Sequence, residues 1–205
     1  MKFLKSNSGK FVAFEGLDGS GQSTQTKLLA DYLKNKGFKV FRTKEPTKNS
    51  KAGKLIREIL DKKEKVTPKK LQKLFAEDRK WHLKNEILPA LKKNKIVISD
   101  RYFFSSFAYG QTSGLDFDWL VRNNTNFLVP DLTFFLAVLP KTCINRIKKR
   151  GSERTLFEER EKLEKVYKNF KKVLKKFPNV KIINGEKSIK KVFADIKKYC
   201  RSLFA

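Results

Sequence analysis

Cysteine, histidine and methionine are scarce in this sequence, and it has no long apolar run. The 205 residues include two cysteines, one histidine and one methionine. Cys143 and Cys200 are far apart and form no C-x-x-C pair, which excludes a disulfide framework and a zinc site as expectations. No apolar run approaches the ~18 residues of a membrane-spanning helix, and residues 1–10 lack the apolar stretch of a secretory signal. We therefore expect a cytoplasmic protein.

Glycine and proline are also sparse, with 10 and 6 residues, whereas phenylalanine occurs 18 times and 40% of the residues are hydrophobic. This composition excludes disordered and fibrous classes. A chain of this length can bury one substantial core and leaves little room for a second. We expect residues 1–205 to form a single domain.

Acidic residues are few, 21 against 48 lysines and arginines, and the formal net charge is +27. Such an excess can indicate a nucleic-acid-binding protein, whose affinity would fall steeply with salt. The lysines, however, are spread along the whole chain, without an arginine-rich tail or a stripe of alternating aromatic and basic residues. This distribution favours a solvated surface, and nucleic-acid binding stays as an alternative.

Short apolar segments alternate with longer helical patterns. The segments predicted to be strands are 10–15, 38–42, 95–99, 132–138 and 179–184. The helices are expected near residues 22–36, 51–61, 68–93, 103–110, 116–123, 141–150, 157–176 and 187–203. Because the strand segments are continuously apolar, they predict a parallel sheet covered on both faces. The expected fold is a three-layer α/β domain with a five-stranded parallel sheet.

Residues 16–23 read GLDGSGQS and match the pattern G-x-x-x-x-G-K-[ST] except for Gln22 in place of lysine. The stretch follows a predicted strand and opens a predicted helix, which is the context of a phosphate-binding loop. Glycines let successive N–H groups point at an anion, and the helix N-terminus adds its dipole. Ser23 is placed to bind Mg²⁺, as expected of a P-loop NTPase fold. The residues expected to hold ATP here are Gly16, Leu17, Asp18, Gly19, Ser20, Gly21, Gln22, Ser23 and Thr24.

Gln22 leaves the activity open. Its amide can donate two hydrogen bonds but carries no charge. Loss of a charge-assisted bond to phosphate costs about 1–2 kcal/mol of binding, and the loss in rate could approach ~10²-fold. A slow enzyme, a compensated enzyme and a protein that only binds nucleotide are all compatible with these magnitudes.

Two further groups of polar residues indicate ligand binding. Asp100 and Arg101 directly follow a predicted strand, so they lie at the carboxyl edge of the sheet, where ligands of such folds bind. Arg101 can clamp a phosphate, and Asp100 can organise Mg²⁺ through water or hold that arginine; a local ion pair is the alternative. Arg79 follows Phe75 by one helical turn, and the two side chains together could stack on and hydrogen-bond a planar base. The alternative is that Phe75 belongs to the core and that Arg79 forms an ion pair on the helix surface.

Asp78 and His82 share the apolar helix face with Phe75 and Arg79, where polar groups must be paired or face a cavity. A catalytic role for His82 is less favoured than a structural one, because phosphoryl transfer needs little general-base help.

Five segments, in this order and spacing, resemble thymidylate kinase, a nucleoside monophosphate kinase. They are EGLDGSGQSTQ (15–25), TKEPT (43–47), LFAEDRKWH (74–82), SDRYFFSSFAYGQ (99–111) and RIKKRGSERTLFE (146–158). The resemblance covers nearly the whole chain. It implies phosphoryl transfer from Mg-ATP to dTMP, giving dTDP, and a two-fold homodimer formed through sheet-flanking helices.

The resemblance also implies roles for individual residues. Phe75 would stack on thymine and Arg79 would bond its edge, with Ser106 near the base. Arg101 would grip the dTMP phosphate, and Tyr109 would crowd the sugar 2′ position.

Asp18 would accept a hydrogen bond from the 3′-hydroxyl group. Glu45 matches the family and would face the acceptor phosphate or its magnesium, whereas Lys44 replaces the more usual arginine. A lysine keeps the charge but loses the planar fork of arginine.

Residues 146–158 lie where the family carries a mobile lid over ATP. Arg146 and Arg150 are one helical turn apart and could reach one polyphosphate. A plain solvated helix is the alternative reading of these basic residues. Our hypothesis is that Arg150, Arg154 or both supply the catalytic charge that Gln22 lacks.

Overall fold

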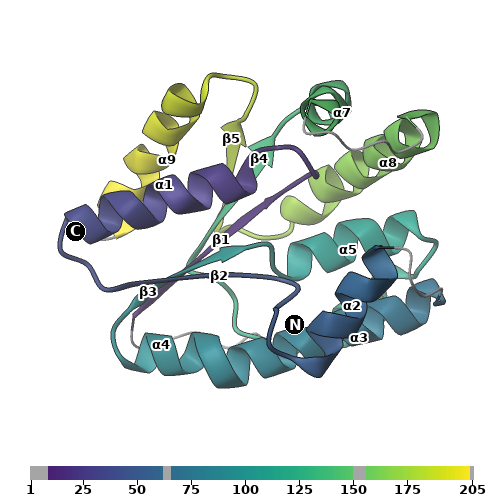
Figure 1. Ribbon diagram of the computed structural model, residues 1–205, viewed down its shortest axis with the longest axis horizontal. Coiled ribbons are helices and arrows are strands. Elements are labelled where there is room, and N and C mark those ends of the chain that lie inside the picture. The colour runs from purple at the N-terminus through teal and green to yellow at the C-terminus, as the bar shows by residue number, and fades with distance from the viewer. Residues whose placement is uncertain (1–8, 62–65, 150–155, 204–205) are drawn as a thin grey trace.

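The computed structural model describes residues 9–61, 66–149 and 156–203. Its centre is a five-stranded sheet of strand order β2-β3-β1-β4-β5, in which every neighbouring pair runs parallel (Figure 1). The strands are β1 (Lys10–Gly16), β2 (Val40–Lys44), β3 (Ile96–Asp100), β4 (Leu132–Ala137) and β5 (Val180–Asn184). The predicted α/β class and five-stranded parallel sheet are confirmed.

Helices cover both faces of this sheet (Figure 1). The helices that precede β3 are α1 (Gln22–Asn35), α2 (Lys51–Leu60), α3 (Pro68–His82), the π-helical turn η1 (Leu83–Ile87) and α4 (Leu88–Lys92). Those that follow β3 are α5 (Phe103–Thr112), α6 (Phe117–Arg122), α7 (Pro140–Lys148), α8 (Leu156–Leu174) and α9 (Ile189–Leu203). Buried residues of α1 and α9 pack on one face, and those of α4, α5 and α8 pack on the other.

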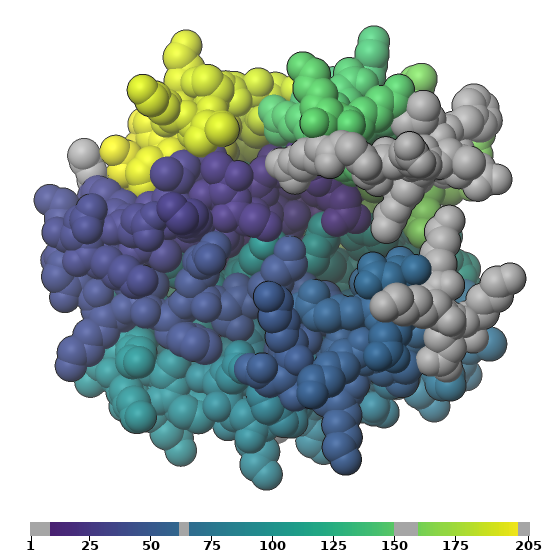
Figure 2. All heavy atoms as spheres, viewed as in Figure 1, coloured from purple at the N-terminus to yellow at the C-terminus, as the bar shows by residue number. Residues whose placement is uncertain are grey.

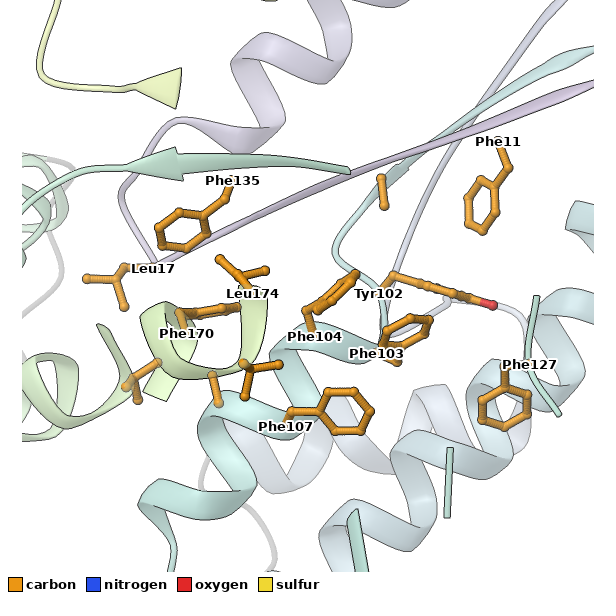
Figure 3. Packing of buried hydrophobic residues seen from close by; sticks show 14 of the residues in the cluster. Phe11, Leu17, Tyr102, Phe103, Phe104, Phe107, Phe127, Phe135, Phe170 and Leu174 are labelled. Carbon is orange, nitrogen blue, oxygen red and sulfur yellow. The ribbon is translucent and has the colours of Figure 1, made fainter. Parts of the chain in front are cut away.

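The continuous apolar run of β1 reflects burial on both sides. Phe11 and Ala13 point into the core under α5 and α8, whereas Val12 and Phe14 point toward α1 and α9, and all four are fully buried. The first core is rich in aromatic rings from several elements. Figure 3 shows rings in this core from β1, β4, α5 and α8, namely Phe11, Phe135, Phe103, Phe104, Phe107 and Phe170.

Strand β2 begins and ends two residues later than its apolar pattern predicted. Phe38 is 39% exposed and lies before the strand. The parallel ladder with β3 decides the boundaries, because it pairs Val40 with Ile96 and Lys44 with Asp100. The shift places Lys44 at the carboxyl edge of the sheet beside Asp100.

The long helix expected near 68–93 is present as α3, η1 and α4 in direct succession. In the π turn the N–H of Leu88 donates to the carbonyl of Leu83, five residues earlier. Pro89 follows immediately and has no N–H to donate, so the wider turn lies where the regular helical ladder would be broken anyway.

Within the three described ranges, no helix combines the length and apolarity that crossing a membrane requires. Cys143 and Cys200 are both buried and free.

Candidate active site

The loop at residues 16–23, here called the phosphate loop, connects β1 to α1. Its three glycines have positive φ angles of 158°, 85° and 98°, and Gly19 and Gly21 lie in the region that favours glycine. A Cβ atom on Gly19 would approach the carbonyl oxygen of Cys143 to 2.6 Å, so this position also needs glycine for space. At Gly21, where α1 begins, no side chain in the described part of the chain caps the helix. Its first N–H groups are therefore suited to an anionic ligand.

Gln22 lies at the start of α1, and its side chain turns back toward β1. The residue is 6% exposed, and its Nε2 donates a hydrogen bond of 3.4 Å to the carbonyl of Phe14. The amide therefore supplies no charge and has part of its donor capacity engaged within the protein.

A cavity of about 320 Å³ lies over the phosphate loop. It brings together residues from the loop, from α1 and from the carboxyl ends of β2 and β3. Its lining residues are Asp18, Gly19, Gly21, Gln22, Ser23, Thr24, Lys44, Asp100 and Arg101. Two segments predicted to bind phosphate, 16–23 and 100–101, thus meet at one cavity.

Ser23 and Asp100 offer a pair of oxygen ligands on the wall of this cavity. The Ser23 hydroxyl donates to Asp100 Oδ2 at 2.5 Å, and the Lys44 ammonium lies 3.3 Å from the same oxygen. Hydroxyl and carboxylate oxygens are the ligands that Mg²⁺ prefers, and it commonly retains waters and substrate phosphates in addition. The donor set therefore fits magnesium bound together with a nucleotide, although no group of three or more His, Cys, Asp or Glu side chains forms a metal cage among the described residues.

Arg101 is held firmly at the edge of the cavity. Its φ is +75°, which is uncommon for a residue with a side chain. The guanidinium donates to Asp18 Oδ1 at 2.8 Å, to the Ser105 hydroxyl at 2.8 Å and to the Gly16 carbonyl at 3.2 Å. The Tyr109 hydroxyl donates to the other oxygen of Asp18 at 3.0 Å. Arg101 also lowers the pKa of Asp18 below its ordinary value, so this carboxylate is charged at neutral pH.

Glu15 lies beneath Arg101 and is fully buried. Its carboxylate accepts hydrogen bonds from the backbone N–H groups of Tyr102 and Ser105 and from the Ser105 hydroxyl at 2.6 Å. Burial nevertheless raises the pKa of Glu15 to about 7, with Arg101 opposing the shift. Glu15 thereby anchors the backbone that carries Arg101.

A second polar network is buried behind the cavity, around Arg79. Its guanidinium donates to Glu45 Oε2 at 2.7 and 2.9 Å, to Ser106 at 3.2 Å and to the side-chain carbonyl of Asn124. Arg79 is 1% exposed and Glu45 2%. The Nδ1 of His82 lies 3.2 Å from the other oxygen of Glu45. Both oxygens of Glu45 are thus engaged within the protein. The role at the acceptor phosphate or its magnesium, which the family resemblance implies, stays a prediction.

Asp78 and His82 are paired, as the burial argument from the sequence required. The Asp78 carboxylate accepts from the N–H of Thr47 at 2.8 Å and from the hydroxyls of Thr47 and Ser50, which fixes the loop after β2. His82 is fully buried, and its Nε2 lies 2.7 Å from the Thr43 hydroxyl. This histidine therefore supports the segment that carries Lys44 and Glu45.

Leu17, expected among the residues that hold ATP, has its side chain fully buried in the core. The other expected residues lie in three places. Phe75 is half-buried on α3, one turn before Arg79. Arg146, on α7, donates to the carbonyls of Ser20 and Gly185 at 3.4 and 3.1 Å. Arg150 and Arg154 lie outside the described residues, so their role in a lid stays a prediction.

Arg146 also borders a second cavity, of about 360 Å³, beside the phosphate loop. Residues of α1 and α9 line its other walls, including Gln25 and Ile189, which are joined by a 3.1 Å hydrogen bond. Figure 2 shows the purple, yellow and green segments that contain α1, α9 and α7 adjoining on one face of the molecule. The loop therefore separates two adjacent cavities, one toward β2 and β3 and one toward α9.

Asn124, Ser105 and Glu15 belong to these networks, but the sequence did not identify them. Glu15 carried a signal, because a carboxylate at the end of an apolar strand that precedes a phosphate loop must be paired. Asn124 stands in a polar stretch, NNTN, without any pattern that distinguishes it.

Comparisons of the sequence with known proteins identify its family. A family model described as thymidylate kinase matches residues 14–196. A protein of Pyrococcus horikoshii named "Probable thymidylate kinase" is 42% identical over 193 residues, which cover 92% of this chain and 94% of that protein. A protein of Desulfotalea psychrophila named "Thymidylate kinase" is 39% identical over 194 residues, which cover 94% and 95%. The chain therefore belongs to the thymidylate kinase family.

Proposed function

We propose that the protein phosphorylates dTMP to dTDP with Mg-ATP as the phosphoryl donor. The observation that carries the proposal is the single cavity at which the phosphate loop, Asp100 and Arg101 meet, in a chain that belongs to the thymidylate kinase family. That membership favours a kinase over a relative that only binds nucleotide, and also over a nucleic-acid-binding protein.

On the donor side, the backbone N–H groups of the phosphate loop and of the first turn of α1 bind the ATP phosphates. Ser23 and Asp100 are positioned as oxygen ligands for magnesium. When bound, the ion neutralises charge on the β- and γ-phosphates during transfer. The cavity beside Arg146 and α9 is the place for the rest of the nucleotide.

On the acceptor side, Arg101 binds the dTMP phosphate. Its hydrogen bonds to Gly16, Ser105 and Asp18 fix the guanidinium before substrate arrives, which lowers the entropic cost of orienting the two phosphates. Tyr109 packs its ring 5.6 Å from the guanidinium and holds Asp18, so these two residues are placed for the sugar of dTMP.

Phe75 and Arg79 would bind the thymine base. Because Glu45, Ser106 and Asn124 engage four of the five N–H donors of Arg79 and fix its side chain, it can present its one remaining N–H in a single orientation. We further infer a cytoplasmic homodimer from the family; light scattering coupled to gel filtration would give twice the 23.9 kDa chain mass for a dimer.

The test is ADP release measured for each nucleoside monophosphate, with ATP and magnesium and a control without acceptor. We expect dTMP to give the highest kcat/KM, and Arg101→Met to lower turnover by ~10² or more. Arg42→Met, an exposed arginine on β2, is the matched control and should leave turnover unchanged. Equal turnover with and without dTMP would contradict the proposal.

A further inference from the structure

Gln22 leaves the donor phosphates without the positive charge that the motif normally places there. Its side chain is neutral, nearly buried and hydrogen-bonded to the Phe14 carbonyl. A cation that replaces the missing lysine must therefore reach the cavity over the phosphate loop from another element.

Two basic residues line this cavity in the described part of the chain, Arg101 and Lys44. The Arg101 side chain is 14% exposed and its guanidinium is engaged by Gly16, Ser105 and Asp18. Lys44 differs in both respects. Its side chain is 52% exposed, and its ion pair is with Asp100 at 3.3 Å. An ammonium group has three donors, so this pairing leaves capacity for a phosphate.

The sheet register brings Lys44 to the start of α1. Lys44 is the last residue of β2 and is the direct partner of Asp100 in the ladder with β3. The Asp100 oxygen that faces the ammonium group is also the one that accepts the Ser23 hydroxyl bond. Lys44 is thus connected, through one shared oxygen atom, to the residue that directly follows Gln22.

We propose that Lys44 supplies the positive charge to the donor phosphates that lysine supplies in the usual loop motif, and is thus a catalytic residue of the donor site. The proposal rests on the proposed kinase function. It reassigns Lys44, which the family resemblance placed on the acceptor phosphate. At this position lysine offers a compact ammonium with three donors, and the pair with Asp100 leaves capacity for a phosphate.

The first test is calorimetric and needs no turnover. Lys44→Met and Lys48→Met are titrated with magnesium and a non-hydrolysable ATP analogue, in the absence of dTMP. Lys48 is an exposed residue of the following loop and makes the matched control. We expect Lys44→Met to weaken analogue binding about 10-fold, the loss of one charge-assisted hydrogen bond, and Lys48→Met to bind as the parent protein does.

Kinetics separate the donor role from an acceptor role. If Lys44 acts on the donor phosphates, Lys44→Met lowers kcat at saturating ATP and dTMP by about 10²-fold. Analogue affinity equal to that of the parent, together with a raised KM for dTMP alone, would overturn the proposal and return Lys44 to the acceptor phosphate. A parent protein that binds the analogue but never phosphorylates dTMP would refute the kinase function instead.

A rescue experiment tests the substitution of one cation for the other. Gln22→Lys should restore much of the analogue affinity and kcat in the Lys44→Met background. In the parent background it should give little gain or a loss, because two cations would then compete for one phosphate. Equal gains in affinity and kcat in both backgrounds would overturn the proposal, since they would show that Lys44 does not supply the charge that a lysine at position 22 supplies. Circular dichroism of each variant checks that it is folded.

Discussion

The buried pair of Glu45 and Arg79 gives the sharpest test of the network behind the cavity. Glu45→Gln preserves the shape of the side chain but removes its charge. The Arg79 guanidinium, 1% exposed, then lacks the carboxylate to which it donates two hydrogen bonds. Removing one partner of a buried ion pair costs about 3–5 kcal/mol, because the other charge is left uncompensated.

For a chain of this length, each kcal/mol lowers Tm by about 2–4 °C, so we expect a loss of about 6–20 °C. Urea unfolding followed by circular dichroism measures the free energy of unfolding directly. The double variant Glu45→Gln/Arg79→Met should be more stable than Glu45→Gln alone, since it removes the uncompensated charge.

Glu164→Gln is the matched control, because Glu164 forms an ion pair with Arg160 at 3.0 Å while the two side chains are 44% and 59% exposed. An exposed pair of this kind contributes about 0.3–0.5 kcal/mol. A cost for Glu45→Gln as small as that of the control would refute the reasoning that Arg79 depends on Glu45 for its charge compensation.

Three other predictions concern residues around the phosphate loop. Because the pKa of Glu15 is raised from 4.5 to about 7, the folded protein retains a proton between these pH values that the unfolded chain has lost, and its free energy of unfolding should fall by up to about 3 kcal/mol as the pH rises from 4.5 to 7. Urea titrations at several pH values should show that Glu15→Gln removes most of this fall. An unchanged pH dependence in the variant would contradict the assignment. Gly19→Ala should abolish binding of the ATP analogue, because the added Cβ would clash with the Cys143 carbonyl. The control Gly37→Ala has the same φ of +85° but open space around the added Cβ, so it should cost about 1–2 kcal/mol of stability and leave binding measured by calorimetry intact. Equal binding by both variants would count against the clash. Cys143 and Cys200 are buried with pKa values raised to about 12, so iodoacetamide should label them, as followed by mass spectrometry, only after denaturation; labelling of the native protein would contradict their burial.

The sequence predicted the sheet well because its signals are local. Each strand lies within two residues of its apolar run. The run is continuous in β1, β3 and β4 because these strands are buried on both faces, whereas the edge strands β2 and β5 are only partly buried. The phosphate loop was predicted between a strand and a helix, and Asp100 and Arg101 were predicted at the carboxyl edge of the sheet, where ligands of such folds bind. The structure brings both to one cavity.

The networks that cross between elements could not be predicted in the same way. The pairing of Arg79 with Glu45 and Asn124 joins segments 34 and 45 residues apart in the sequence, and no periodicity records such contacts. The position of Lys44 depended on a two-residue difference in the bounds of β2, which the ladder with β3 decides. The missing charge at Gln22 was visible in the sequence, whereas the position of Lys44 next to Asp100 became apparent only from the register.

Phosphoryl transfer despite Gln22 is tested most directly by ³¹P NMR of the protein mixed with ATP, magnesium and dTMP. We predict that the resonances of dTDP and ADP appear together in equal amounts, and that omission of dTMP leaves the ATP resonances unchanged. If the resonances of ATP and dTMP persist although the protein is folded and binds the non-hydrolysable analogue, the account is contradicted. The protein would then bind nucleotide without kinase activity.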